Sequence, residues 1–134
     1  NGFKSVKMDE KMIFSHITGL QHIGIPTKSI DSSVGFYKKL GFKVCFKSDI
    51  AVFMELNSLL IELYSSENAT EKTGAIDHIA LNSDNIQLSF EYCKSIGFKM
   101  LDKEINYLPF FENGVKFFAI EGVNGEKIEF NQIL

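Results

Sequence analysis

The amino-acid sequence predicts one α+β domain built from two similar βαβββ units. The first observation behind this prediction is an internal repeat. At an offset of 56 residues, eight of the 23 positions from 22 to 44 carry the same residue as their counterparts. The second is the order of hydrophobic periods. In each copy a strand-like alternation comes first, a helical stripe follows it, and three further strand-like segments come last.

Length and composition fit a single globular domain. The chain has 134 residues, 45% of them hydrophobic, which is enough for a substantial core. A formal net charge of −3 and the lack of basic clusters argue against nucleic acid as a partner. No apolar run approaches 18 residues, so we expect no membrane span. Two cysteines, Cys45 and Cys93, are too few for a disulfide framework, and we expect a cytoplasmic protein.

The first unit is expected over about 19–64. It follows an N-terminal extension, 1–15, in which we see no secretory signal and in which Met8 or Met12 is a candidate natural start. Its first strand covers about 20–25 and should end at Pro26, which cannot donate a ladder hydrogen bond. Ser29 or Asp31 can cap the following helix, which should end at Gly41. The helix carries an apolar stripe of Ile30, Val34, Tyr37 and Leu40. Three strands follow, at about 42–47, 50–56 and 59–64.

The second unit is expected over about 74–131, after a polar linker at 65–73. Its first strand lies at about 76–81, Asp84 or Asn85 can cap the helix, and Gly97 should end it. The helical stripe is repeated as Ile86, Phe90, Cys93 and Ile96. Strands follow at about 98–103, 115–121 and 127–131. The offset grows from 56 to 67 late in the unit, which places an 11-residue insertion around 104–113.

Four predicted strands each carry one side chain that can bind a metal. These are His22, Glu62, His78 and Glu129. Because side chains alternate between the two faces of a strand, their apolar neighbours should pack on the helices while these four point the other way. If the units pair about a pseudo-twofold axis, the four side chains meet near it. Two imidazoles and two carboxylates, with two positions left for water, suit an octahedral divalent ion such as nickel, cobalt, zinc, manganese or iron.

The order His22, Glu62, His78, Glu129 on paired βαβββ units resembles the vicinal-oxygen-chelate superfamily of glyoxalases, bleomycin-resistance proteins and dioxygenases. The resemblance covers about 19–131 and is strongest to glyoxalase I, the lactoylglutathione lyases. It implies a single glyoxalase-like domain over 1–134 whose units form a half-open eight-stranded barrel, with the four residues as metal ligands. It also implies a homodimer, and the ligand pairs can come from one chain or from two.

The function implied by the resemblance is that of a metal-dependent lyase or isomerase acting on a small carbonyl substrate. The metal would chelate vicinal oxygens of the substrate and stabilise an enediolate. Glu129 is the preferred base for moving the proton, and Glu62 is the alternative. One departure from glyoxalase I stands out, because all 14 basic residues are lysines. Glyoxalase I holds the carboxylates of glutathione largely through arginines, so glutathione is a doubtful cosubstrate.

Strand parity and the insertion suggest which residues line the substrate site. Across a tight turn at Asn57 and Ser58, Phe53 should lie opposite Glu62. Lys116 is notable, because a lysine on an apolar face needs an anion such as a substrate carboxylate or phosphate. The expected lining residues are Phe53, Tyr64, Asn82, Tyr107, Phe110, Phe111, Lys116 and Phe118. Two other functions stay open, namely a non-catalytic protein that sequesters a small molecule and an epimerase of acyl-CoA esters.

Overall fold

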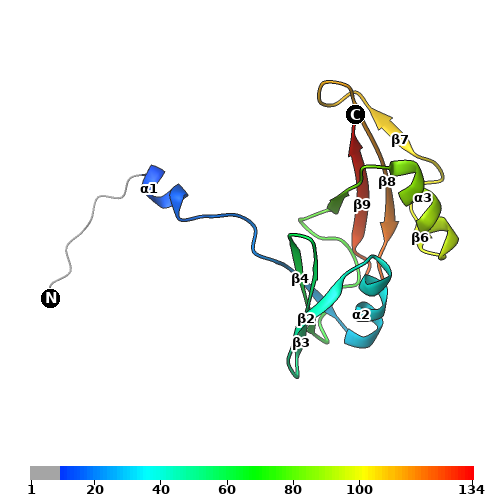
Figure 1. The fold of residues 1–134 in the computed structure, drawn as a ribbon. Helices are drawn as coiled ribbons and strands as arrows, with labels where there is room; N and C mark the ends of the chain where they lie inside the picture. The colour runs from blue at the N-terminus through cyan, green and yellow to red at the C-terminus, as the bar shows by residue number, and fades with distance from the viewer. Residues whose placement is uncertain (1–9) are drawn as a thin grey trace.

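A computed structural model describes residues 10–134 (Figure 1). A short helix, α1 (Glu10–Ser15), stands apart from the body of the protein. The first unit contains β1 (Ile23–Thr27), α2 (Ile30–Lys39), β2 (Lys43–Lys47), β3 (Ala51–Leu56) and β4 (Leu59–Ser65). The second contains β5 (Ile79–Asn82), α3 (Ile86–Ser95), β6 (Lys99–Met100), β7 (Asn106–Leu108), β8 (Val115–Glu121) and β9 (Lys127–Ile133). The predicted α+β class and the order of elements are confirmed.

Each unit forms its own sheet. The first has the strand order β1-β4-β3-β2, and the second has the order β5-β9-β8-β6 with β7 also paired to β8. In both sheets the opening strand lies at an edge and runs parallel to the closing strand, while the remaining pairs are antiparallel. The sheets do not close into a barrel. The eight-strand prediction missed β7, which arises from the inserted segment.

Both helices begin and end where the sequence predicted. The Ser29 and Asn85 side chains accept hydrogen bonds from backbone N–H groups in the first helical turns, and so act as N-caps. Gly41 and Gly97 follow the C-terminal ends with φ angles of +96° and +80°, a conformation that favours glycine. In the described part of the chain, no helix is long and apolar enough to span a membrane.

A continuous apolar core joins the helices to one face of each sheet. In the first unit it contains Val52, Met54, Ile61 and Leu63, and all four are almost fully buried. In the second unit, Phe118 stacks on Phe130 and meets Phe90 of α3 edge to face. Because strand side chains alternate, packing this face on the helices leaves the opposite face of each sheet to carry polar side chains.

Polar contacts between the two units fix how they sit together. The Tyr37 hydroxyl donates a 2.9 Å hydrogen bond to Glu126 Oε2 in the β8–β9 turn. Asn124 of the same turn donates to Ser33 Oγ at 2.8 Å. Tyr92 of α3 donates to the Lys39 carbonyl at 2.6 Å. Burial, together with the Glu126 charge and hydrogen bond, raises the pKa of Tyr37, so this hydroxyl stays protonated.

Several predicted strand boundaries were wrong. Strand β1 begins at Ile23 and β5 at Ile79, so His22 and His78 precede their strands, and β6 covers only Lys99–Met100. Strand β1 does not stop at Pro26 but continues through it to Thr27. Because β1 is an edge strand with β4 as its partner, a proline can be tolerated when its missing N–H would have faced the open side. In the longer strand, Thr27 Oγ1 accepts a 2.8 Å hydrogen bond from Ser33 Oγ of α2.

Candidate metal site and its surroundings

The face of the first sheet away from the helices carries one histidine–glutamate pair. We call it the first ligand face. His22 directly precedes β1, and Glu62 lies on β4 with Gly24 as its cross-strand partner. His22 Nε2 is 3.4 Å from Glu62 Oε1. A Cβ at position 24 would lie 3.5 Å from the Tyr64 ring and 3.6 Å from Glu62 Oε1, so this position adjoins the pair.

The second sheet repeats this arrangement on the face that we call the second ligand face. His78 directly precedes β5, and Glu129 lies on β9 beside Ala80. His78 Nε2 is 3.8 Å from Glu129 Oε2. The side chains of the first pair are 32% and 27% exposed, and those of the second pair 41% and 16%, so all four retain solvent access.

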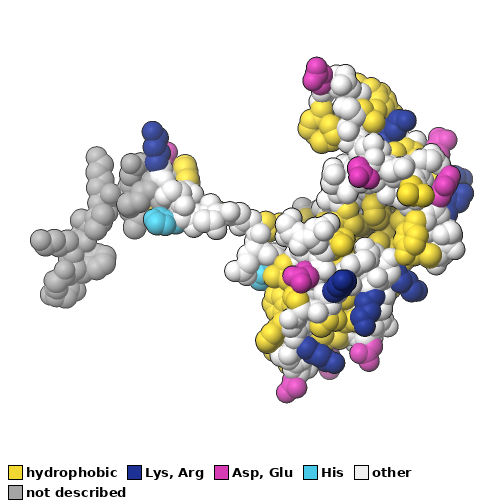
Figure 2. Space-filling model, viewed as in Figure 1, with side chains coloured by type: hydrophobic (Ala, Val, Ile, Leu, Met, Phe, Trp, Pro, Cys, Tyr) yellow, Lys and Arg dark blue, Asp and Glu magenta, His cyan; other side chains and the backbone are white. Residues whose placement is uncertain are grey.

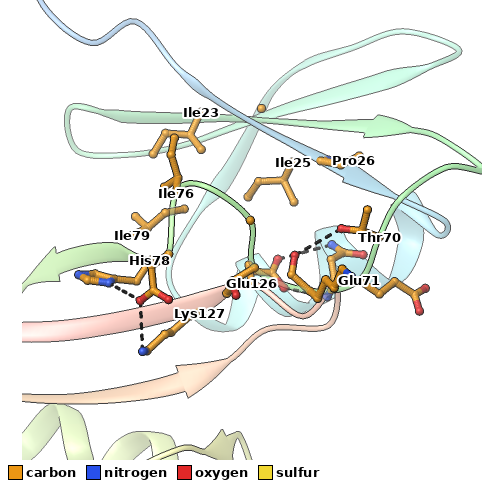
Figure 3. A pocket seen from close by; sticks show the side chains of 16 residues that line it. Ile23, Ile25, Pro26, Thr70, Glu71, Ile76, His78, Ile79, Glu126 and Lys127 are labelled. Atoms are coloured by element: carbon orange, nitrogen blue, oxygen red, sulfur yellow. Dashed lines mark hydrogen bonds and ion pairs between the residues drawn. The ribbon is translucent and has the colours of Figure 1, made fainter.

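Each histidine has its second ring nitrogen occupied by the residue before it. His22 Nδ1 lies 2.9 Å from Gln21 Oε1, and His78 Nδ1 lies 2.8 Å from Asp77 Oδ2. Both partners are acceptors, so Nδ1 carries the hydrogen and Nε2 of the neutral ring keeps its lone pair for a metal. Hydrogen bonds from His78 and Lys127 lower the pKa of Asp77, which is therefore ionised at neutral pH (Figure 3).

Sequence reasoning missed Gln21 and Asp77. They occupy equivalent positions at the 56-residue offset, and each is a polar residue directly before the repeated histidine. That coincidence was the available signal. Histidines that bind metals usually donate their other N–H to such an acceptor, which fixes the tautomer and the ring orientation.

The donor separations within each pair suit a shared metal. Two donors at about 2.1 Å from one ion lie about 3.0 Å apart in octahedral and about 3.4 Å apart in tetrahedral geometry. The observed 3.4 and 3.8 Å need only small side-chain adjustments. However, among residues 10–134 no three His, Cys, Asp or Glu side chains converge on one point. The chain therefore presents two separate pairs, whereas a meeting of all four near one axis had been predicted.

Aromatic side chains surround the first pair. Phe53 lies opposite Glu62, as the tight turn predicted, and its ring is 5.5 Å from that of His22. Phe46 of β2 packs edge to face on Phe53. Tyr64, two residues beyond Glu62 on β4, lies on the same face. Figure 2 shows exposed apolar side chains over this part of the body, around β2, β3 and β4.

The second ligand face differs from the prediction by one residue of register. Ala119, not Phe118 or Ile120, lies opposite Glu129, and Phe117 lies opposite Asn131. Phe118 is therefore fully buried in the core. Lys116 lies opposite Gln132 on the helix side of the sheet, so it is not on the ligand face as predicted.

The cause of this register is the β8–β9 turn. Five residues, 122–126, separate the paired Glu121 and Lys127, and this spacing brings Ala119 opposite Glu129. Glu126 is held in the turn because its carboxylate accepts hydrogen bonds from the Asn124 backbone and from Tyr37. Asn82 keeps its predicted place, since it follows His78 and Ala80 on the second ligand face.

The inserted segment, around 104–113, does not cover either histidine–glutamate pair within the chain. Tyr107 pairs with Lys116 and therefore shares the helix side of the sheet, with its ring packed over Gly114. Phe110 and Phe111 are exposed on the loop that follows β7. Their predicted role in substrate binding stays a prediction.

A cavity of about 180 Å³ lies at the junction of the units (Figure 3). Its apolar walls come from β1 and from the segment leading into β5, including Ile23, Ile25, Ile76 and Ile79. His78 and its neighbours Asp77 and Lys127 also line it, whereas His22, Glu62 and Glu129 do not. The cavity therefore reaches the second ligand face at His78 but includes neither glutamate.

Comparison with known proteins agrees with the fold and with the repeat. A family model described as the Glyoxalase/Bleomycin resistance protein/Dioxygenase superfamily matches residues 19–130. The chain belongs to this superfamily. It is 36% identical over 126 residues to a Bacillus subtilis (strain 168) protein named uncharacterized protein YwbC, and the match covers 84% of this chain and 96% of that protein.

Solved structures support the same fold at low sequence identity. The fosfomycin resistance protein FosX from Listeria monocytogenes gives a TM-score of 0.73 at 18% identity, covering 88% of this chain and 95% of that one. Lactoylglutathione lyase from Agrobacterium tumefaciens gives 0.67 at 14% identity, covering 86% and 93%. This superfamily thus includes resistance proteins and lyases, and the activity of this chain must be argued from its own residues.

Proposed function

We propose that the protein is a metal-dependent lyase or isomerase of glyoxalase type that acts on a small carbonyl substrate. The observation that carries this proposal is the repeated pair of an imidazole and a carboxylate. Each pair is open to solvent, and each histidine is tied through Nδ1 so that Nε2 faces its glutamate. A divalent metal bound to these groups would supply Lewis-acid stabilisation of negative charge on substrate oxygens.

The complete site is proposed to form between two copies of the chain. Each copy would contribute its first ligand face to one site and its second ligand face to the other. This arrangement follows from the separation of the two pairs within the chain, because neither pair alone supplies the three or four protein ligands usual for a catalytic metal. A two-fold dimer then contains two equivalent sites.

Glu129 is proposed as the base that takes the carbon-bound proton and returns it to the neighbouring carbon. The two glutamates differ in what lies opposite them. Glu62 lies opposite the large ring of Phe53, whereas Glu129 lies opposite the small side chain of Ala119. A carboxylate of this kind must lie within hydrogen-bond reach of the carbon that it deprotonates.

Metal content and proton exchange test the activity. Purified protein, loaded in turn with nickel, cobalt, zinc and manganese, is expected to hold one metal per chain, and His78→Ala is expected to lose it. His16→Ala is the control, since His16 has no counterpart in the repeat. The loaded protein should exchange the α-proton of a hemithioacetal with solvent deuterium. Failure to retain any of these metals would contradict the proposal.

Mixing two inactive variants tests the shared site. His22→Ala and His78→Ala are unfolded together at equal amounts and refolded, so that mixed dimers form. In a mixed dimer one site contains both substitutions and the other contains neither, so about a quarter of all sites in a random mixture should be intact. If all ligands of a site came from one chain, no intact site would form and neither metal nor activity would return.

A second candidate function is sequestration of a small molecule without catalysis. The aromatic surroundings of the first pair, Phe46, Phe53 and Tyr64, favour it, because such rings bind apolar compounds without a metal. The two functions differ in their metal dependence. Ligand binding that is unchanged in His22→Ala and His78→Ala would support sequestration over catalysis.

A further inference from the structure

The strand lysines on the two ligand faces each have an acidic neighbour. On the second face, Lys127 Nζ is 3.2 Å from Asp77 Oδ2, and Lys99 Nζ is 2.7 Å from Glu121 Oε2. On the first face, Lys43 lies opposite Glu55 at the far end of the sheet. Among the described strands, these faces therefore offer no lysine that lacks an acidic neighbour.

Lys116 had been the candidate for binding an anionic substrate, and its position removes that role. It pairs with Gln132 and Tyr107 on the helix side of the second sheet, while the neighbouring Phe117 points to the ligand face. The chain has no arginine to take its place. A substrate carboxylate or phosphate would thus meet, among the described strand residues of these faces, no lysine without an acidic neighbour.

The charges around the metal position also disfavour an anion. Glu62 and Glu129 together carry two negative charges, which one divalent ion balances. On the second face, Glu121 and Asp77 are paired with Lys99 and Lys127. An additional unpaired carboxylate would lose hydration on entering and gain no opposite charge, which is unfavourable.

What the faces do offer is apolar and aromatic surface. Phe53 and Phe46 contact one another beside His22. Phe117 lies across from Asn131, two residues beyond Glu129 along β9. Rings at these positions on both halves of the site can pack against a flat apolar group.

We propose that the substrate is an uncharged molecule whose adjacent oxygens reach the metal and whose apolar or aromatic body packs on Phe53 and Phe117. This inference rests on the proposed metal-dependent function. It excludes a substrate held by a carboxylate-bearing or phosphate-bearing carrier.

Two probes of nearly equal size test the proposal. 4-Carbamoylbenzohydroxamic acid and 4-carboxybenzohydroxamic acid share two adjacent oxygens and a benzene ring, but only the second carries a carboxylate at neutral pH. Binding to the metal-loaded protein is measured by titration calorimetry, with metal content determined on the same sample. The amide is expected to bind about 10-fold more tightly than the carboxylate, because the carboxylate probe must lose the hydration of a charge that finds no partner in the site.

Lys116→Met serves as the matched variant, since this exposed lysine lies outside the ligand faces. It is expected to leave both dissociation constants unchanged. Equal or tighter binding of the carboxylate, or its selective weakening in Lys116→Met, would overturn the proposal. If metal is bound but neither probe binds, the substrate class is refuted while the metal site stands. If no metal is bound, the proposed function itself fails, and this inference fails with it.

Discussion

Replacing Asp77 should weaken metal binding although Asp77 is not proposed as a ligand. Its carboxylate holds the His78 ring through Nδ1 at 2.8 Å, and Lys127 shares the same oxygen at 3.2 Å. In Asp77→Ala the ring loses the acceptor that fixes its tautomer and orientation. Nε2 then faces Glu129 in only part of the population.

The magnitude follows from the kind of acceptor and its exposure. Loss of such a partner usually costs about 10–100-fold in metal affinity. Because Asp77 is exposed, we expect the lower end, about 10-fold. Gln21→Ala removes a neutral acceptor from His22, and hydrogen bonds to neutral groups are about half as strong as those to charged ones, so about 3-fold is expected.

The assay is competition for zinc or nickel between the protein and a chromophoric chelator of known affinity. Lys127→Met is the control, because it removes the second partner of Asp77 but keeps the hydrogen bond that His78 Nδ1 donates to Asp77. It should change the affinity little. A loss in Gln21→Ala as large as that in Asp77→Ala, or a 10-fold loss in Lys127→Met, would refute the orienting role.

Three further predictions concern the body of the protein. Tyr37→Phe should lower the free energy of unfolding by about 2 kcal/mol, because it removes a partly buried hydrogen bond to the Glu126 carboxylate. Tyr92→Phe removes an exposed hydrogen bond and should lower it by only about 0.5 kcal/mol, as measured by urea titration of both variants. Burial raises the pKa of Cys93 to about 11, so at pH 8 a thiol reagent should modify Cys45 quickly and Cys93 only on unfolding, as resolved by peptide mass analysis. Gly125→Ala should cost more than about 2 kcal/mol, because φ is +77° there and a Cβ would collide with the Glu71 backbone; an unchanged melting temperature would contradict the close approach.

The sequence predicted those parts of the fold that short-range chemistry determines. Ser29 and Asn85 cap the helices because their side chains accept hydrogen bonds from backbone N–H groups only three residues further along the chain. Gly41 and Gly97 end them for the same local reason. The two-residue turn at Asn57 sets the register of β3 on β4, so Phe53 could be placed opposite Glu62.

The errors came from contacts between distant residues. The β8–β9 turn sets the register of β9 on β8, and its Glu126 accepts a hydrogen bond from Tyr37, which is 89 residues away. One residue of register moves every side chain of a strand to the other face, which is why Lys116 and Phe118 were misplaced. The separation of the two ligand pairs depends likewise on how α2 docks on the second unit, as through Ser33 and Asn124.

The repeat and its departures explain different parts of the proposed chemistry. A metal bound between two halves would take donors from both, and the repeated histidine and glutamate would supply an imidazole and a carboxylate from each half. A substrate without two-fold symmetry needs different side chains around it in the two halves of the site. The halves differ in this respect, because Glu62 faces Phe53 while Glu129 faces Ala119, and Tyr64 in one half is replaced by Asn131 in the other. The side with Glu129 has the smaller cross-strand neighbour, so we expect the reacting carbon of the substrate to lie on that side.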